Sequence, residues 1–266
     1  MTKWAKMDIK TELEIKKMEK AGELLASILS ELCTLCVPGI STKQLDEIAE
    51  NLVLDNNALP TFKGYHGYPA TICSSVNDVI IHGIPTSAKL KSGDILSIDM
   101  GLTLEGWIAD SALTIPIGKV SAEAMKLIEV TQTSLYRGLE LAKPGFRLFD
   151  ISRAIQNYVE DNGYSVVRDF VGHGVGRNLH EDPSIPNFIP PLTSIYRNIK
   201  LKPGMTLAIE PMVNQGTHDV KIMKDRWTVR TRDNKLSAHF EHSIAICKDK
   251  TVILTHRKDD KINREL

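Results

Sequence analysis

The chain has 266 residues, 42% of them hydrophobic and 25% charged, and its 33 Lys and Arg residues balance 33 Asp and Glu residues. This composition excludes a disordered chain, and the zero net charge disfavours a broad basic surface for nucleic acid or anionic membranes. No apolar run reaches the roughly 18 residues that a membrane helix needs. The N-terminal residues, with Lys3, Lys6 and Asp8, lack the apolar core of a secretory signal, and four cysteines make no disulfide framework. We therefore expect a cytoplasmic protein.

The first predicted element is a long helix over about 10–35, because its apolar residues recur at helical spacing. Cys33 and Cys36 stand near its end, and a C-x-x-C pair of this kind can bind zinc only with further ligands. Because no second pair accompanies them, we interpret both as buried helix cysteines. A Pro-Gly turn follows, and Ser41 with Gln44 forms a capping box that predicts a second helix ending near residue 57.

A β-hairpin is predicted next, around the two-residue turn Glu105-Gly106. This turn places Asp99 opposite Ala112, with Asp110 as the diagonal neighbour on the same face, about 7–8 Å away. Two carboxylates on one face of an apolar hairpin repel each other unless a cation lies between them. The hairpin therefore indicates a cation site.

The second half of the chain repeats the first. Residues 90–99 recur as 201–210, residues 76–83 as 167–174, and residues 109–115 have an echo in 240–246. Helices are predicted over about 121–142 and again after the Pro144-Gly145 turn, as in the first half. We therefore expect an α+β fold in a single domain, 1–266, whose halves (roughly 10–118 and 119–255) are related by pseudo-twofold symmetry, with one site between them.

Acidic residues and histidines recur in step with this repeat. The candidate ligands are Asp99, Asp110, His173, Glu210 and Glu241. Four carboxylates balance two divalent ions better than one, and a single nitrogen among oxygens suits Mn, Fe, Co or Zn. Spacing alone therefore predicts a two-metal hydrolase and leaves amide and phosphate-ester substrates open.

The segment 183–200, with its four prolines, is predicted to be a long surface loop beside His180.

At these residues the sequence resembles the type I methionine aminopeptidases. The resemblance rests on Tyr65-His66-Gly67-Tyr68-Pro69, on His82-Gly83, on Gly172-His173-Gly174 and on Ile209-Glu210-Pro211-Met212, and it extends through Trp227 and Phe240-Glu241-His242. It implies the pita-bread fold and the removal of an initiator methionine when the second residue is small. A bacterial-like subtype is expected, because Glu241 follows Glu210 by only 31 positions, which leaves no room for the insertion of type II enzymes.

The resemblance also implies roles for individual residues. Asp110 and Glu241 would bridge two metal ions, Asp99 would complete one, and His173 with Glu210 would complete the other. Glu210 would also shuttle a proton, and His82 and His180 would contact the substrate and stabilise the tetrahedral intermediate. Tyr65, Cys73 and Trp227 would contact the methionine side chain, and His66 would also bind the substrate.

The partners that the resemblance implies are nascent polypeptides with a free N-terminal Met, with the ribosome as a candidate. No sequence-specific nucleic acid or membrane partner is expected, and the protein is expected to be a monomer.

Three positions depart from the family pattern. Leu179 stands where an aromatic residue is common, Ser111 where Thr is usual, and Arg226 where Gly usually precedes the tryptophan. Three alternatives remain open at this point: a prolidase or aminopeptidase P of the same fold, a binding protein that has lost catalysis, and a phosphoesterase. The first usually carries an additional N-terminal domain, the second has usually lost ligands, and the third needs an anion-binding cluster that this sequence lacks.

Overall fold

The structure is a computed structural model that describes residues 7–266. Residues 1–6, which belong to the N-terminal segment from which we expect no secretory signal, lie outside the described residues. Four helices lie where the sequence predicts them: α1 (Glu12–Leu35), α2 (Thr42–Asp55), α3 (Ala122–Glu140) and α4 (Leu148–Asp161). The predicted capping box of Ser41 and Gln44 is present, and Thr11 with Glu14 forms another at the start of α1. None of the described helices is long and apolar enough to cross a membrane.

The strands are short apart from one hairpin. In the first half they are β1 (Leu59–Pro60), β2 (Ile72–Val76), β3 (Val79–Ile81), β4 (Ile95–Leu104) and β5 (Trp107–Pro116), with the 3-10 turn η1 (Tyr65–Gly67). In the second half they are β6 (Ser165–Val166), β7 (Gly172–Gly174), β8 (Glu181–Ile185), β9 (Thr206–Ile209), β10 (Met212–Asn214), β11 (Val220–Ile222), β12 (Val229–Thr231), β13 (Ser237–His239), β14 (His242–Ile246) and β15 (Thr251–Ile253).

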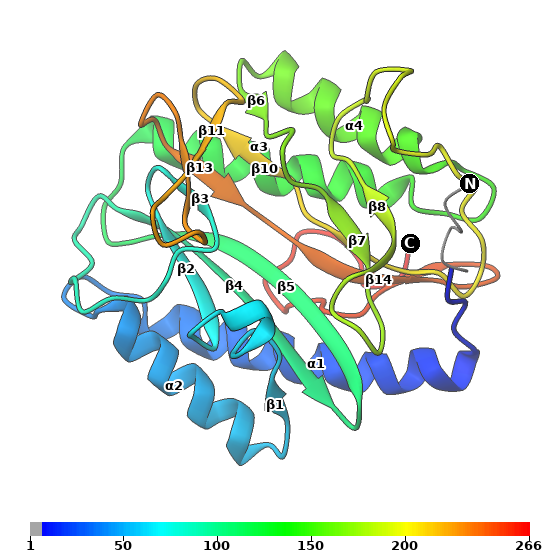
Figure 1. The fold of residues 1–266 in the computed structure, drawn as a ribbon, viewed down its shortest axis with the longest axis horizontal. Helices are drawn as coiled ribbons and strands as arrows, with labels where there is room; N and C mark the ends of the chain where they lie inside the picture. The colour runs from blue at the N-terminus through cyan, green and yellow to red at the C-terminus, as the bar shows by residue number, and fades with distance from the viewer. Residues whose placement is uncertain (1–6) are drawn as a thin grey trace.

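These described strands form four sheets that lie between the two helix pairs (Figure 1). One sheet joins β1, β4, β2 and β5, and another has the order β15-β14-β9-β7-β8. The two smaller sheets have the orders β13-β10-β6 and β11-β12-β3. Helices α1 and α2 pack on the first sheet, and α3 and α4 pack against strands of the second half, so that two large apolar clusters flank the sheets.

The β4–β5 hairpin has the predicted register. Leu104 pairs with Trp107 across the two-residue turn, and Asp99 pairs with Ala112. Glu105 and Gly106 both have positive φ values, +50° and +76°, as a two-residue hairpin turn of type I′ requires. The turn chemistry therefore sets which face of the hairpin carries the two aspartates.

Two sequence expectations need correction. Cys33 lies within α1 and is only half-buried, whereas Cys36 is buried but caps the helix instead of belonging to it. The segment 183–200 is not a simple surface excursion, because its first three residues belong to β8 and Asn187 and Phe188 are buried. Asn187 donates a hydrogen bond through Nδ2 to the backbone oxygen of Glu210 (3.0 Å). A side chain with such a partner anchors this segment to the candidate site.

Candidate active site

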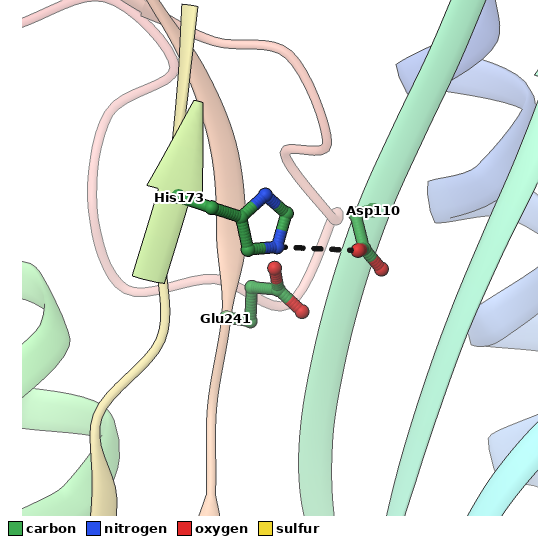
Figure 2. Close-up of side chains that lie close together, drawn as sticks. All are labelled: Asp110, His173 and Glu241. Carbon is green, nitrogen blue, oxygen red and sulfur yellow. Dashed lines mark ion pairs between the residues drawn. The ribbon is translucent and has the colours of Figure 1, made fainter. Parts of the chain in front are cut away.

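Three of the predicted ligands converge from strands of both halves. Asp110 lies on β5, His173 on β7, and Glu241 immediately before β14, and each offers a ligand atom within 4.8 Å of the other two (Figure 2). His173 Nε2 is 3.8 Å from Asp110 Oδ2 and 3.6 Å from Glu210 Oε1. All three side chains are buried. Asp110 precedes His173 by more than 60 positions and Glu241 follows it by more than 60, so the fold brings distant parts of the chain together.

Strand register explains why these side chains meet. Asp99 pairs with Ala112, which leaves Asp110 on the diagonal. In the second half His173 pairs with Ala208, and Glu210 lies two residues beyond Ala208, again on the diagonal. Diagonal neighbours share one face of a sheet, so each half contributes two ligands around a small residue.

Glu241, the fifth candidate ligand, lies in a segment that is hydrogen-bonded to β5 of the first half. The backbone N–H of Glu241 donates to the oxygen of Ala112 (2.9 Å), and Ser111 Oγ donates to the oxygen of Glu241 (2.8 Å). Ser243 Oγ both accepts from the N–H of Asp110 (3.0 Å) and donates to its carbonyl oxygen (2.8 Å). Hydroxyl groups thus replace strand pairing between β5 and the segment that carries Glu241. The departure from Thr to Ser at position 111 keeps the hydroxyl that makes this contact.

The buried carboxylates lack donors. Oδ1 of Asp99, Oδ1 of Asp110 and Oε1 of Glu241 have no hydrogen-bond partner among the described residues. Burial raises the pKa of Asp99 to about 7 and that of Glu210 to about 8. Burial and the neighbouring carboxylates also raise the pKa of Asp110 and of Glu241 well above the ordinary range. Such a cluster is unfavourable when ionised unless a cation compensates it.

His173 is prepared to act as a ligand. Its Nδ1 lies 2.9 Å from the carbonyl oxygen of Gly174, so Nδ1–H donates and the lone pair resides on Nε2, which faces the carboxylates. Burial lowers the pKa of His173 to about 3, which keeps the ring neutral at physiological pH. Neutral imidazole is the form that binds metals. One imidazole and four carboxylates, of which Asp99, Asp110 and Glu241 each have an unpartnered buried oxygen, therefore fit a divalent-metal centre.

A charged network lies directly behind the ligands. Arg257, only 5% exposed, donates through Nη1 to Ser111 Oγ (2.8 Å) and lies 3.4 Å from Asp260 Oδ1. The pKa of Asp260 is well below its usual range, because the hydrogen bond with His242 and the charge of Arg257 outweigh the effect of burial. The guanidinium also lowers the pKa of Glu241 in opposition to burial. Arg257 therefore places a fixed positive charge next to the carboxylate cluster.

The same cavity has a second wall of a different character. It is lined by all five candidate ligands and by the aromatic, apolar, histidine and cysteine side chains Phe62, Tyr65, Tyr68, Cys73, Ile81, His82, Phe170, Val171, Leu179, His180 and Trp227. Burial lowers the pKa of His82 to about 4, so this ring is neutral at physiological pH. Tyr65 Oη lies 2.8 Å from His180 Nδ1. A wall of aromatic and sulfur-bearing side chains suits a thioether or other apolar side chain.

One candidate does not lie in this cavity. His66 is exposed, has a positive φ of +48°, and packs edge-on against Tyr65 with ring centroids 4.3 Å apart. It is absent from the residues that line the cavity. The structure therefore places His66 against the ring of Tyr65 and outside the set of residues that line the cavity.

Sequence reasoning overlooked His239. This ring is buried, both of its nitrogens lack hydrogen-bond partners among the described residues, and Nε2 lies 3.6 Å from Glu210 Oε2. His239 precedes Glu241 by two positions, and strand alternation places such residues on one face. That spacing could have identified it as part of the site.

Comparison with known proteins agrees with this geometry. Residues 16–248 match the model of metallopeptidase family M24. The chain belongs to this family. It is 54% identical over 246 residues to methionine aminopeptidase 1 of Bacillus subtilis, covering 92% of this chain and 98% of that protein. The solved structure of a methionine aminopeptidase from Rickettsia prowazekii superposes with a TM-score of 0.90 at 41% identity, covering 94% of this chain and all of that one.

Membership of this family confirms the resemblance and the pita-bread fold, and it implies the use of divalent metal. A prolidase from Pyrococcus furiosus shares the fold, with a TM-score of 0.75 at 22% identity, and this chain covers 66% of it. That likeness concerns the fold alone.

Proposed function

We propose that this chain is a metal-dependent aminopeptidase that removes an N-terminal methionine from polypeptides whose second residue is small. The observation that carries the proposal is the cavity itself, in which Asp110, His173 and Glu241 converge on one wall while Tyr65 and Trp227 line the other. The names of two relatives that are 54% and 52% identical to this chain support the same activity. We further propose two divalent ions, drawn from Co, Mn, Fe and Zn, because four carboxylates balance two dications.

The five candidate ligands would hold these ions. Asp110 and Glu241 would be shared, Asp99 would serve one ion, and His173 with Glu210 the other. When bound, divalent ions supply Lewis acidity toward the scissile carbonyl and the attacking water. Glu210 lines the substrate cavity beside His173, with Oε1 3.6 Å from His173 Nε2, and would be placed to move a proton at its Oε atoms. His239 Nε2, 3.6 Å away, would hold that carboxylate in place.

The two histidines of the substrate wall would orient the peptide. His82 is neutral at physiological pH, and its ring lies edge-on to Phe170 and Trp227 with centroids 5.9 and 6.2 Å apart, so it can donate one hydrogen bond in a fixed direction. His180 is held by Tyr65 and lies 4.3 Å from His173, measured between ring centroids. Both rings would therefore direct N–H groups at the oxygen that gains negative charge in the transition state.

The substrate wall also explains the proposed specificity. Phe62, Tyr68, Cys73 and Leu179 are each less than 9% exposed, so an apolar side chain that enters between them is removed from water. The unbranched thioether of methionine adapts to such a surface. Only the first residue of a polypeptide carries a free α-amine, and the candidate carboxylate ligands would hold the divalent ion that binds it.

Release of methionine from Met-Ala-Ser and from Met-Leu-Ser tests the proposal, with metal-free protein titrated with Mn²⁺ or Co²⁺. We expect metal-dependent release from the first peptide and little from the second. A formylated Met-Ala-Ser peptide should not react, because its amine is blocked. Hydrolysis of Xaa-Pro peptides without release of methionine would instead indicate a prolidase-like enzyme.

The proposed substrates, nascent polypeptides, imply action in the cytoplasm near the ribosome. The segment 217–235, which carries Trp227 at the cavity, has six Lys or Arg residues and three Asp residues. This local excess of positive charge is the kind of surface that phosphate backbones attract. Co-sedimentation with ribosomes at low salt, lost when Lys221 and Lys224 are both changed to Glu, would support this part of the proposal; sedimentation unaffected by the change would contradict it.

A further inference from the structure

Lys10 is a buried cation that lies outside the ligand set. Its side chain is only 2% exposed and pairs with Glu181, whose side chain is 9% exposed and which stands 171 positions away. Lys10 Nζ also lies 3.3 Å from the backbone oxygen of Asp8. A buried ion pair contributes little net stability compared with apolar residues of the same size, so its value lies in fixing geometry.

Glu181 divides its two oxygens between Lys10 and the backbone of the preceding loop. Oε2 pairs with Lys10, while Oε1 accepts hydrogen bonds from the N–H groups of Arg177 (3.0 Å) and Asn178 (3.1 Å). One carboxylate therefore closes the loop 176–181 on itself. The N–H of Ile108 also holds the loop through the oxygen of Gly176 (2.8 Å), but Glu181 is the charged group that fixes the stretch before His180, so loss of its counter-charge should shift that stretch.

Lys10 reaches Glu181 across the loop backbone at Gly176. A Cβ at Gly176 would lie 2.6 Å from Lys10 Cε and 2.7 Å from Glu181 Oε1, so only glycine leaves room for the lysine. The backbone of Lys10 is itself anchored, because its N–H donates to the oxygen of Gly204 (2.8 Å). The backbone position of Lys10, in the segment before α1, is therefore fixed while its side chain reaches Glu181.

The loop that is held in this way carries part of the substrate wall. Leu179, 5% exposed, and His180 both line the cavity, and His180 meets Tyr65 on its other side at 2.8 Å. We propose that Lys10 and Glu181 are a positioning pair, which sets His180 and Leu179 against the substrate without touching it. This inference rests on the proposed function for its kinetic test.

A double-mutant cycle between Lys10→Met and His180→Ala tests the proposal on the full-length, metal-loaded protein with Met-Ala-Ser. We expect Lys10→Met alone to lower kcat/KM roughly ten- to a hundredfold, since small misplacements of a positioned group have effects of this size. In the His180→Ala background the same change should lower kcat/KM by clearly less than in the unmodified protein, because one of the two residues it positions is already gone and only the effect on Leu179 is left. Lys250→Met, which breaks the exposed pair with Glu265, is the matched control and should leave kcat/KM unchanged.

Two results would overturn the proposal: kcat/KM of Lys10→Met within about twofold of the unmodified protein, or effects of the two changes that multiply. If Lys10→Met does not fold, Glu181→Gln replaces it in the same cycle with the same criteria, since the amide oxygen can still accept from the loop.

A readout that needs no turnover is the ¹⁵N spectrum of the imidazole rings. Loss of the His180 Nδ1 hydrogen-bond signal in Lys10→Met supports the proposal, and an unchanged His180 signal contradicts it. The inactivity of the unmodified protein toward Met-Ala-Ser would refute the proposed function and leave this spectral test intact.

Discussion

The two walls of the cavity are built in different ways. The candidate metal ligands lie on strands or at their ends, where register fixes each side chain: Asp99 opposite Ala112, and His173 opposite Ala208. The substrate wall consists mainly of residues on loops and turns; His82 has a positive φ of +57°, and so does Arg226, at +68°, next to Trp227. Loops need additional contacts to hold a side chain in place, which Tyr65 and the Lys10–Glu181 pair supply for His180. Changes in one wall should therefore affect metal binding, and changes in the other should affect the substrate.

The largest effect on activity is expected from a substitution of Asp110, one of the candidate metal ligands that a strand holds in place. Asp110→Asn removes one negative ligand and should lower methionine release roughly a thousandfold or more, since a catalytic metal supplies several kcal/mol of transition-state stabilisation. Metal content after gel filtration should fall in parallel. Glu105→Gln, at the exposed turn of the same hairpin, is the control and should retain both metal and activity. Full activity of Asp110→Asn would contradict the assignment.

The next effect concerns the network behind that wall. Arg257→Met removes the donor to Ser111 and the charge near Glu241, and should weaken metal binding roughly 10- to 100-fold, as outer-shell changes do. The KM for Met-Ala-Ser at saturating metal should change little. Calorimetric titration of metal-free protein with Mn²⁺ measures the first quantity. Arg264→Met, which breaks an exposed pair with Glu23, serves as the control; equal metal affinities in the two variants would rule out this role for Arg257.

A smaller effect is expected in the pH dependence of stability without metal. Burial raises the pKa of Asp99 to about 7 and of Glu210 to about 8, so between pH 6.5 and 8 the folded state binds more protons than the unfolded chain. Stability must then fall as the pH rises through this window. The lowered pKa values of the buried histidines act in the opposite sense, but this effect fades above about pH 7, because unfolded histidine, with a pKa of about 6.5, is then mostly deprotonated. We expect the Tm of metal-free protein to drop on the order of 5 °C, whereas saturating Mn²⁺ abolishes the drop. A Tm that rises over this window without metal would contradict the account.

The smallest effect is expected at the turn before Trp227. Arg226 has a φ of +68°, which is unfavourable for a residue with a Cβ. Arg226→Gly should stabilise the protein by about 0.5 kcal/mol, the relief of strain being partly offset by the flexibility of glycine in the unfolded chain. Thermal unfolding should show a rise in Tm of about 2 °C. Arg232→Gly, without a positive φ, should lower the Tm instead; a lower Tm for Arg226→Gly as well would show that this turn is not strained.

The contrast between the walls also explains how far sequence could predict the structure. The turn at Glu105-Gly106 and strict strand alternation were enough to pair Asp99 with Ala112, because register follows from local chemistry. Helix caps such as Ser41 are equally local. Contacts that join distant loops leave no periodic signal, so neither Lys10 with Glu181 nor Arg257 with Ser111 could be predicted. The place of His66, outside the residues that line the cavity, could not be predicted either, since its positive φ belongs to a local turn.

A structure of the protein with Mn²⁺ and methionine, with anomalous scattering from the metal, tests most directly whether one cavity serves both partners. We predict metal peaks among Asp99, Asp110, His173, Glu210 and Glu241. The methionine side chain should lie against Tyr65, Cys73 and Trp227, with His180 beside its carboxylate. Metal bound away from these carboxylates, or methionine outside this cavity, would contradict the account.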